Sequence, residues 1–560
     1  MRPDRKRKQK IVMDFKYSRQ GLTDKEKPLE RFLEILPGAL SWTIIIGICL
    51  LSALKPIAAA VMMIAFLLYW LLRLIYLNIF LVLSYIRLEI EKDTDWMERI
   101  AAVDKLTSQQ PAFCDLDTIN GLKNKISARM HCRQLMNVKK SNNVPPLSKD
   151  IYHLVIIPVI REPAEIVEPG IQAILKGFYP PKRFIVIIAI EEAAPDSVKQ
   201  DMSKLQEKYK NDFYELLLTL HPVNQNGEAR VKGANAAFAA RHAEEYLRKK
   251  QIARENVLVS CFDADSVAHQ NYFSCLAYYF LINPNRLRSS YQPVPVYHNN
   301  IWEAPGFARI IDIGTSFFQL IEATNPSKLV TFSSHSMSFK ALWDVGYWPV
   351  DMISDDSAIF WKAFIHYGGD YHVAPIYTTV SMDIATGPTM GKTFFSIYKQ
   401  KRRWAWGVEN FPIVVRAFLK SKEISWKQKI SYGYKLLDSF VSWATWSFLL
   451  LLGTWLPTFF ASREFASSTV YYTVPRIRSI MFGLASIGIV VCMILSLLLL
   501  PKRKGKHSIL IKIKHSFEWL LIPVILLFLS AIPALDAQTR LMFAKYMEFW
   551  VTEKYRKVKD

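Results

Sequence analysis

Two acidic residues directly follow an apolar run in the middle of the chain. The run Val257–Phe262 leads into Asp263-Ala264-Asp265. In an extended chain, residues two apart point to the same side, so both carboxylates face one ligand. Paired carboxylate oxygens hold Mg²⁺ or Mn²⁺, and such an ion neutralises a diphosphate. The motif is short, and an exposed acidic turn is the competing interpretation.

A second acidic site, Ser354-Asp355-Asp356, opens the amphipathic run Ser357–Ile365. Serine or aspartate at a helix start accepts hydrogen bonds from unpaired backbone N–H groups and complements the helix dipole. The same carboxylates also have the chemistry of a general base that takes a proton from an acceptor hydroxyl. The sequence leaves both interpretations open.

A third group, Gln400-Lys401-Arg402-Arg403-Trp404, mixes cations with an aromatic ring. An arginine at Arg403 suits a diphosphate, because a guanidinium donates paired hydrogen bonds to phosphate oxygens. The flat face of Trp404 suits a sugar ring. The competing interpretation is a basic stripe that faces lipid head groups.

These residues need a scaffold, and residues from 151 onward alternate between strand-like and helix-like patterns. This alternation predicts a mostly parallel α/β sheet, in which ligands bind at the carboxyl ends of the strands. The predicted strands are Ile151–Ile160, Phe184–Glu191, Phe213–Leu220 and Val257–Asp263. The predicted helices between them are Ala164–Leu175, Asp196–Lys208 and Lys232–Lys249.

Long apolar segments crowd both ends of the chain and predict membrane spans. They are Leu36–Leu54, Pro56–Ile86, Leu436–Ala461, Ile480–Leu500 and Phe517–Leu535. The second span is about 45 Å long as a helix, against a bilayer core of about 30 Å, so we expect it to protrude into the cytosol. Its single charge, Arg73, is then expected near the lipid head groups or against protein. Two shorter segments, Thr393–Trp406 and Val408–Phe418, have the composition of helices in the membrane interface.

The formal charge of +22 lies mainly beside the apolar segments. Basic residues precede the first span and follow the one that ends at Leu500, which is typical of cytoplasmic segments that face anionic lipid. No zinc-ligand spacing or other nucleic-acid module is present, so a nucleic-acid polymer is not the expected partner. The cysteines are scattered, and we expect all of them to be free thiols in a reducing compartment: Cys49, Cys114, Cys132, Cys261, Cys275 and Cys492.

Taken in order, the motifs resemble family 2 glycosyltransferases, and by layout the cellulose, chitin and hyaluronan synthases. The motifs are Ile157-Pro158, Glu191-Glu192, Lys232-Gly233-Ala234-Asn235, Asp263-x-Asp265, Ser354-Asp355-Asp356 and Gln400-x-x-Arg403-Trp404. The resemblance covers about residues 150–410. It implies a Rossmann-like, nucleotide-sugar-binding GT-A domain of the α/β class, inserted between α-helical transmembrane segments.

The resemblance also implies residue roles and a divalent cofactor, Mg²⁺ or Mn²⁺. Nucleotide-sugar binding falls to Glu191, Lys232, Asp263, Gln400 and Arg403, the metal to Asp265 with Asp263, the catalytic base to Asp356, and acceptor binding to Trp404. Two departures matter. Glu191 stands where the family usually has the first Asp of Asp-Asp-Gly-Ser, and Ser-Asp-Asp replaces Thr-Glu-Asp, so Asp355 stays a competing base.

Near the carboxyl end, Phe549-x-Val551-Thr552-x-Lys554 is similar to the gating loop of cellulose synthases. An amphipathic basic tail is the other interpretation. A gating role requires a cytosolic tail. Pro523 and Pro533 could break the last apolar segment into a re-entrant or interfacial element. The chain then crosses the membrane fully four times, and its tail is cytosolic.

The predicted organisation is a basic amino terminus with a transmembrane hairpin (1–87), a connecting segment (88–150), the catalytic domain (151–392), interfacial helices (393–430) and a membrane region with a cytosolic tail (431–560). We expect a multi-pass protein of the plasma membrane with a cytosolic catalytic domain. The expected activity is inverting transfer of a sugar, from a UDP-sugar by resemblance, to an acceptor hydroxyl, in processive polysaccharide synthesis. The alternatives are a single-sugar transferase with a lipid-linked acceptor and an inactive membrane transporter or scaffold. A second subunit for export is a further possible partner.

Overall fold

A computed structural model describes residues 15–110, 121–141, 143–460, 463–501 and 508–550 of the chain. Its centre is one eight-stranded mixed sheet in the order β3-β2-β1-β4-β7-β6-β8-β5. The strands are β1 (Tyr152–Val159), β2 (Phe184–Glu191), β3 (Glu215–His221), β4 (Val257–Cys261), β5 (Val267–Ala268), β6 (Ser289–Val296), β7 (Ser336–Ser338) and β8 (His372–Ser381).

The first half of the sheet agrees with the sequence prediction. Strands β1, β2, β3 and β4 are parallel, with β1 between β2 and β4. The near-continuous Val, Ile and Leu content of β1 and β2 reflects burial on both faces. The second half was not predicted, and it contains antiparallel pairs of β7 with β4 and with β6. The α/β class of the fold is confirmed.

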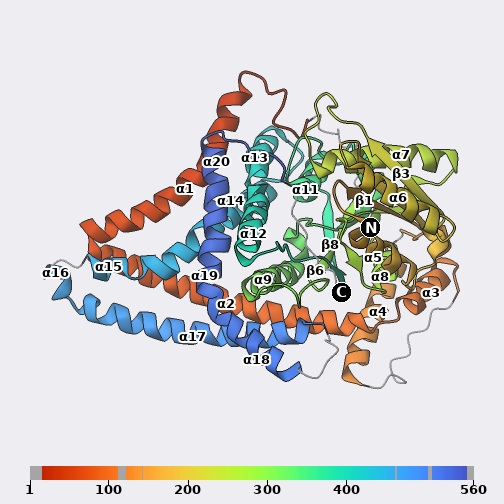
Figure 1. The fold of residues 1–560 in the computed structure, drawn as a ribbon. Helices are drawn as coiled ribbons and strands as arrows, with labels where there is room; N and C mark the ends of the chain where they lie inside the picture. Colours follow the sequence, from red (N-terminus) through yellow and green to blue (C-terminus); the bar gives the residue numbers. More distant parts are fainter. Residues whose placement is uncertain (1–14, 111–120, 142, 461–462, 502–507, 551–560) are drawn as a thin grey trace, which may run out of the picture.

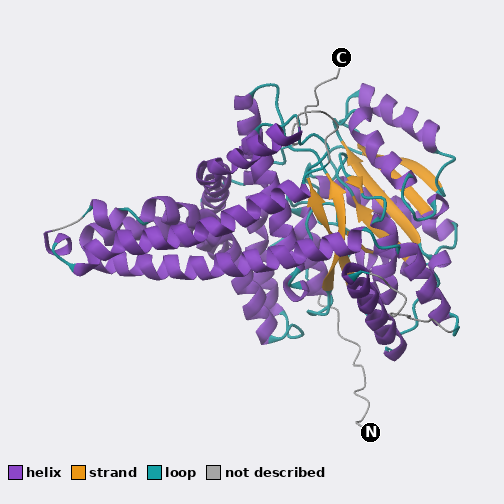
Figure 2. Ribbon diagram, turned by 90° about the horizontal axis from the view of Figure 1, so that it is seen from below, coloured by secondary structure: helices purple, strands orange, loops and turns teal. Residues whose placement is uncertain are grey.

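Helices cover both faces of the sheet (Figure 2). On one face, α5 (Ala164–Leu175), α6 (Asp196–Tyr209) and α8 (Tyr272–Ile282) contribute to one hydrophobic core. On the other, α7 (Lys232–Lys249) and α11 (Asp355–His366) contribute to a second core. The α7 face that meets the sheet consists of small residues, Ala236, Ala237 and Ala240 among them, so the helix packs closely on β1 and β2.

Four long apolar helices project from this domain: α1 (Glu26–Leu54), α2 (Pro56–Lys92), α14 (Trp426–Phe448) and α17 (Thr469–Leu499). Their far end carries the short helices α15 (Leu456–Phe459) and α16 (Arg463–Ala466), well away from the sheet (Figure 1). By length and composition, these four helices and a fifth segment, Lys512–Met542, are each able to cross a membrane. The composition of these helices is thus that of a membrane protein.

The fifth segment does not run alongside the other four. It consists of α18 (Ser508–Glu518), α19 (Ile522–Leu526), a π-helical stretch (Leu527–Ala531) and α20 (Ile532–Met542), and it runs across α2 in Figure 1. Pro523 and Pro533 each stand near the start of a helix, where a missing N–H costs nothing.

Contacts fix both ends of this segment to helices beside the sheet and to the start of α1. Glu518 accepts two hydrogen bonds of 3.0 Å from Arg309 of α9 (Gly306–Ala323). Asp536 accepts a 2.9 Å hydrogen bond from Arg402 of α12 (Met390–Ala405). Leu541 accepts one of 2.9 Å from Arg31, near the start of α1. These contacts hold the segment against α9, α12 and α1.

The connecting segment (88–150) packs against the α/β domain and contains a disulfide-bonded cysteine. Helix α2 continues to Lys92, and α3 (Trp96–Thr107) inserts the fully buried Trp96 against Tyr278 and Tyr279 of α8. Cys132, on α4 (Leu122–Lys140), is in a disulfide, so the prediction that every cysteine is free is wrong. Spacing along the chain could not show that pairing. Four other cysteines are free: Cys49, Cys261, Cys275 and Cys492.

Candidate active site

The carboxyl ends of the parallel strands open into one large cavity of about 1180 Å³. Glu191 ends β2, His221 ends β3, and Asp263 and Asp265 follow β4. Parallel strands present these ends along one edge of a sheet, which brings the side chains together. The cavity wall includes nearly all the predicted site residues that the structure describes: Glu191, Lys232, Asp263, Asp265, Asp356, Gln400, Arg403, Trp404 and Phe549.

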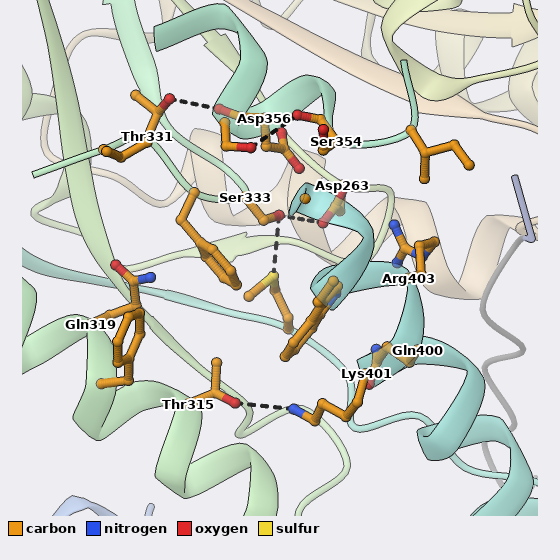
Figure 3. A pocket seen from close by; sticks show the side chains of 18 of the residues that line it. Asp263, Thr315, Gln319, Thr331, Ser333, Ser354, Asp356, Gln400, Lys401 and Arg403 are labelled. Carbon is orange, nitrogen blue, oxygen red and sulfur yellow. Dashed lines mark hydrogen bonds between the residues drawn. The ribbon is translucent and has the colours of Figure 1, made fainter. Parts of the chain in front are cut away.

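Lys232, the first residue of α7, links two of the predicted acids. Its Nζ donates to Asp263 Oδ1 at 2.8 Å and to Asp356 Oδ1 at 3.0 Å. Asp263 also accepts a hydrogen bond from Ser333 (Figure 3). Gly233 lets α7 approach closely, because a Cβ there would lie 2.5 Å from the carbonyl oxygen of Pro349 and 2.9 Å from the Cβ of Asp355.

Asp265 is buried just behind Asp263. Its Oδ2 accepts a 2.8 Å hydrogen bond from the backbone N–H of Asp383, two residues after β8. This bond ties the acidic loop after β4 to the unpredicted half of the sheet. Ser333 and Asp383 were missed by the sequence reasoning, because neither belongs to a recognisable motif.

The loop before α11 is held by Glu409, another residue that the sequence reasoning missed. Glu409 Oε1 accepts hydrogen bonds from the backbone N–H groups of Ile353 and Ser354, at 3.1 and 3.0 Å, and from Ser354 Oγ at 2.8 Å. Ser354 occupies the N-cap position of α11 but makes no side-chain cap. Its hydroxyl therefore fixes the loop to Glu409, instead of serving the expected capping function.

The two aspartates of this loop have different surroundings. Asp356 faces the cavity, with 26% of its side chain exposed. Asp355 is buried, and its Oδ2 has no hydrogen-bond partner among the described residues. Burial raises the pKa of Asp355, and the neighbouring charge of Asp356 raises it further. Asp355 thus resists ionisation, whereas Asp356 is held against the ammonium group of Lys232.

In the motif Gln400-Lys401-Arg402-Arg403-Trp404, the cationic side chains face protein or the cavity. Lys401 is buried and donates to Asp312 Oδ1 at 2.8 Å and to Thr315 Oγ1 at 3.0 Å (Figure 3). The Lys401 Nζ also lies 3.8 Å from the centre of a Trp404 ring. The interpretation of this motif as a basic stripe in contact with lipid is therefore wrong for Lys401.

Arg403 lies on the cavity wall beside the carboxyl end of the chain. Its guanidinium carbon is 5.4 Å from the centre of the Phe549 ring. Gln400, one turn earlier, is buried, and its Oε1 has no partner within the described part of the chain. Of the predicted gating motif, Val551, Thr552 and Lys554 lie outside the described residues, so only Phe549 is located.

At the other side of the cavity, His221 lies between two carboxylates. Its Nδ1 is 3.0 Å from Glu191 Oε2, and its Nε2 is 2.9 Å from Glu228 Oε2. Burial raises the pKa of Glu191, and the contact with His221 opposes this shift. The sequence predicted Glu191 here but missed His221 and Glu228, because neither belongs to a motif that we recognised.

Residues 258–531 match the family model described as glycosyl transferase family group 2. The matched part of the chain is a family 2 glycosyltransferase sequence. The match spans the sequence from β4 to the π-helical stretch, so it includes Asp263, Asp356 and Gln400–Trp404. The match identifies the protein as a glycosyltransferase, and the alternative of an inactive scaffold is not supported.

Several solved glycosyltransferase structures are distantly similar. The mannosyltransferase PcManGT from Pyrobaculum calidifontis, in complex with GDP-Man and Mn²⁺, is 15% identical, with 65% of this chain and 96% of that chain covered and a TM-score of 0.37. Residues 1–349 of S. aureus TarS with UDP-GlcNAc are 12% identical, with coverages of 70% and 91% and a TM-score of 0.35. No curated protein matches the sequence significantly.

Separate substitutions of Arg403 and Trp404 in the glycosyltransferase should have different kinetic effects. We expect Trp404→Ala chiefly to raise the KM for acceptor or to shorten the product, because it removes a flat apolar surface. Arg403→Ala should chiefly lower kcat, because it removes a cation from the departing diphosphate. Steady-state kinetics with donor and acceptor varied separately will distinguish the two. Wild-type kinetics for both variants would contradict both assignments.

Proposed function

We propose that the enzyme transfers a sugar from a nucleotide-sugar donor, with inversion at the anomeric carbon, to a hydroxyl of a growing glycan at the membrane. The observation that carries the proposal is the arrangement of Asp263, Lys232 and Asp356 around one cavity that Arg403 and Trp404 also line. Arg403, which suits a diphosphate, and Asp356, which can accept a proton, thus line the same cavity.

In this proposal the oxygen of the acceptor hydroxyl attacks the anomeric carbon, and Asp356 accepts the proton of that hydroxyl. Arg403 stabilises the negative charge that develops on the leaving diphosphate. The ammonium group of Lys232 donates to Asp356 Oδ1 at 3.0 Å and so holds this carboxylate in position at the cavity. Inversion needs one displacement and no covalent sugar–enzyme intermediate.

The residues after β4 fit a Mg²⁺ or Mn²⁺ ion bound together with the donor. Asp263 and Asp265 supply hard carboxylate oxygens, the ligands that these ions prefer. Among the described residues, no group of three or more His, Cys, Asp or Glu side chains could hold a metal by itself. The diphosphate and water must therefore complete the coordination, and the bound ion would neutralise phosphate charge.

The decisive experiment incubates the purified enzyme with each common nucleotide sugar and with Mg²⁺ or Mn²⁺. Nucleotide release and product length are measured together. Release with long products supports processive synthesis, and release with a single added sugar supports the alternative of one transfer to a lipid-linked acceptor. Absence of release with every donor would contradict the proposal.

We further propose that the catalytic domain and both ends of the last apolar segment are cytosolic. A cysteine at Lys545, just after α20, should resist an impermeant thiol reagent added to intact cells, in a background without other cysteines. A matched cysteine at Arg463, the first residue of α16 at the far end of the bundle, should react readily. Labelling at Lys545 from outside would establish a fifth crossing and eliminate any gating role for Phe549.

A further inference from the structure

The cavity does not end at the reaction centre but continues between the membrane helices. Its wall includes Arg73 on α2 and Asp438 and Trp446 on α14. Charged side chains within membrane helices are costly, and they usually mark a binding site or a pathway. This part of the cavity is therefore a candidate binding site for a ligand.

The depth of Arg73 in the membrane follows from helix length. Helix α2 starts at Pro56, at the far end of the bundle, so Arg73 lies about 26 Å along it at 1.5 Å per residue. Asp438 is paired with Arg73 at 3.4 Å and therefore lies at a similar depth. A bilayer core is about 30 Å thick. Both residues thus lie near the inner head groups.

The guanidinium of Arg73 is held in place by protein contacts, but these contacts do not use all of its hydrogen-bond donors. Its Nη1 donates to the hydroxyl of Tyr69 at 3.1 Å and to Asp438 Oδ2 at 3.4 Å, and its carbon lies 4.4 Å from the centre of the Trp446 ring. Within the described residues, its Nε and Nη2 groups make no hydrogen bond to protein. About a third of the side chain, 32%, is exposed.

A nearby cation, Lys435, also lines the cavity but is engaged differently. Its Nζ donates to Glu322 and to the carbonyl oxygen of Lys328, the latter at 2.7 Å. Arg73 thus keeps donors in the planar arrangement that recognises phosphate oxygens. The wall beside it is apolar, with Leu74 and Leu77 on the same helix.

We propose that this membrane end of the cavity binds the phosphate head group of a single lipid from the inner leaflet, with Arg73 as its main hydrogen-bond donor. The hydrocarbon tail stays against the apolar helices, while the head group faces the reaction centre. This inference rests on the proposed function and names the class of acceptor. The acceptor is a lipid phosphate that carries a glycan or another group with a free hydroxyl.

Binding to the full-length enzyme in a non-ionic detergent tests the site directly, with dodecyl phosphate as the probe and isothermal titration calorimetry as the measurement. Arg73→Gln should weaken binding roughly ten- to hundredfold, the scale of lost hydrogen bonds to a charged group. Asp438→Asn should tighten binding, because it removes the anion that competes for Arg73. A merely structural role for the pair would not produce opposite effects.

The matched control is Arg478→Gln. Arg478 is another arginine of a membrane helix stacked on a tryptophan, 3.6 Å from the centre of the Trp455 ring, but it does not line the cavity. This variant should bind dodecyl phosphate as the wild type does. Equal binding of dodecanol would show that the phosphate is not recognised, and equal binding of inorganic phosphate would show that no lipid is required. Either result overturns the proposal, as does unchanged binding in Arg73→Gln.

A second measurement places the lipid on the acceptor side. Dodecyl phosphate should inhibit sugar transfer by the wild type but not by Arg73→Gln, and it should leave nucleotide binding unchanged in both. Transfer that is insensitive to the probe would overturn the acceptor assignment. Failure of the proposed function itself looks different, because the wild type would then release no nucleotide from any donor.

Discussion

Asp356→Asn is expected to bind the donor normally and to lose turnover by roughly 10²-fold or more, the scale of a positioned general base. The amide keeps the shape of the side chain and can still contact Lys232, but it accepts no proton. Donor affinity from calorimetry and kcat from nucleotide release, measured on the same preparation, will separate the two effects. Wild-type turnover would exclude Asp356 as the base.

Asp355→Asn is the matched control on the neighbouring residue. Because burial raises the pKa of Asp355, its side chain is mainly in the neutral acid form that asparagine imitates. We therefore expect a much smaller loss of turnover than for Asp356→Asn. If Asp355→Asn is inactive and Asp356→Asn is active, the role of base moves to Asp355.

Asp265→Asn is expected to abolish transfer and to remove the divalent-ion dependence of nucleotide binding. The variant keeps an oxygen that can accept the hydrogen bond from the Asp383 N–H, but it removes one negative charge from the predicted metal site. Nucleotide affinity measured with Mn²⁺ and with a chelator should differ in the wild type and converge in the variant.

The control for charge loss alone is Asp370→Asn. Asp370 is a surface carboxylate, 43% exposed, paired with Arg288 at 2.7 Å, and it does not line the cavity. It should keep both activity and the Mn²⁺ effect. Unchanged activity in Asp265→Asn would remove the metal assignment, whatever the result for Asp370→Asn.

The local elements of the first half of the sheet were predictable because each carries its own hydrophobic period. β2 and α7 agree residue for residue with the predicted ranges Phe184–Glu191 and Lys232–Lys249. The convergence of Glu191 and Asp263 was also predictable, since parallel strands align their carboxyl ends. Strands β6, β7 and β8 were missed, because their mixed parallel and antiparallel pairing depends on partners distant in sequence.

The sequence by itself determined which side chains have the chemistry for donor binding, and that apolar helices flank a central α/β domain. Only the tertiary structure decided which carboxylate is buried, because the surroundings of Asp355 come from α7 and from the loop held by Glu409. It also decided that Lys401 faces Asp312 instead of lipid, and that Phe549 returns to Arg403. Burial and such contacts depend on segments that are far apart in sequence, so no local pattern of residue types records them.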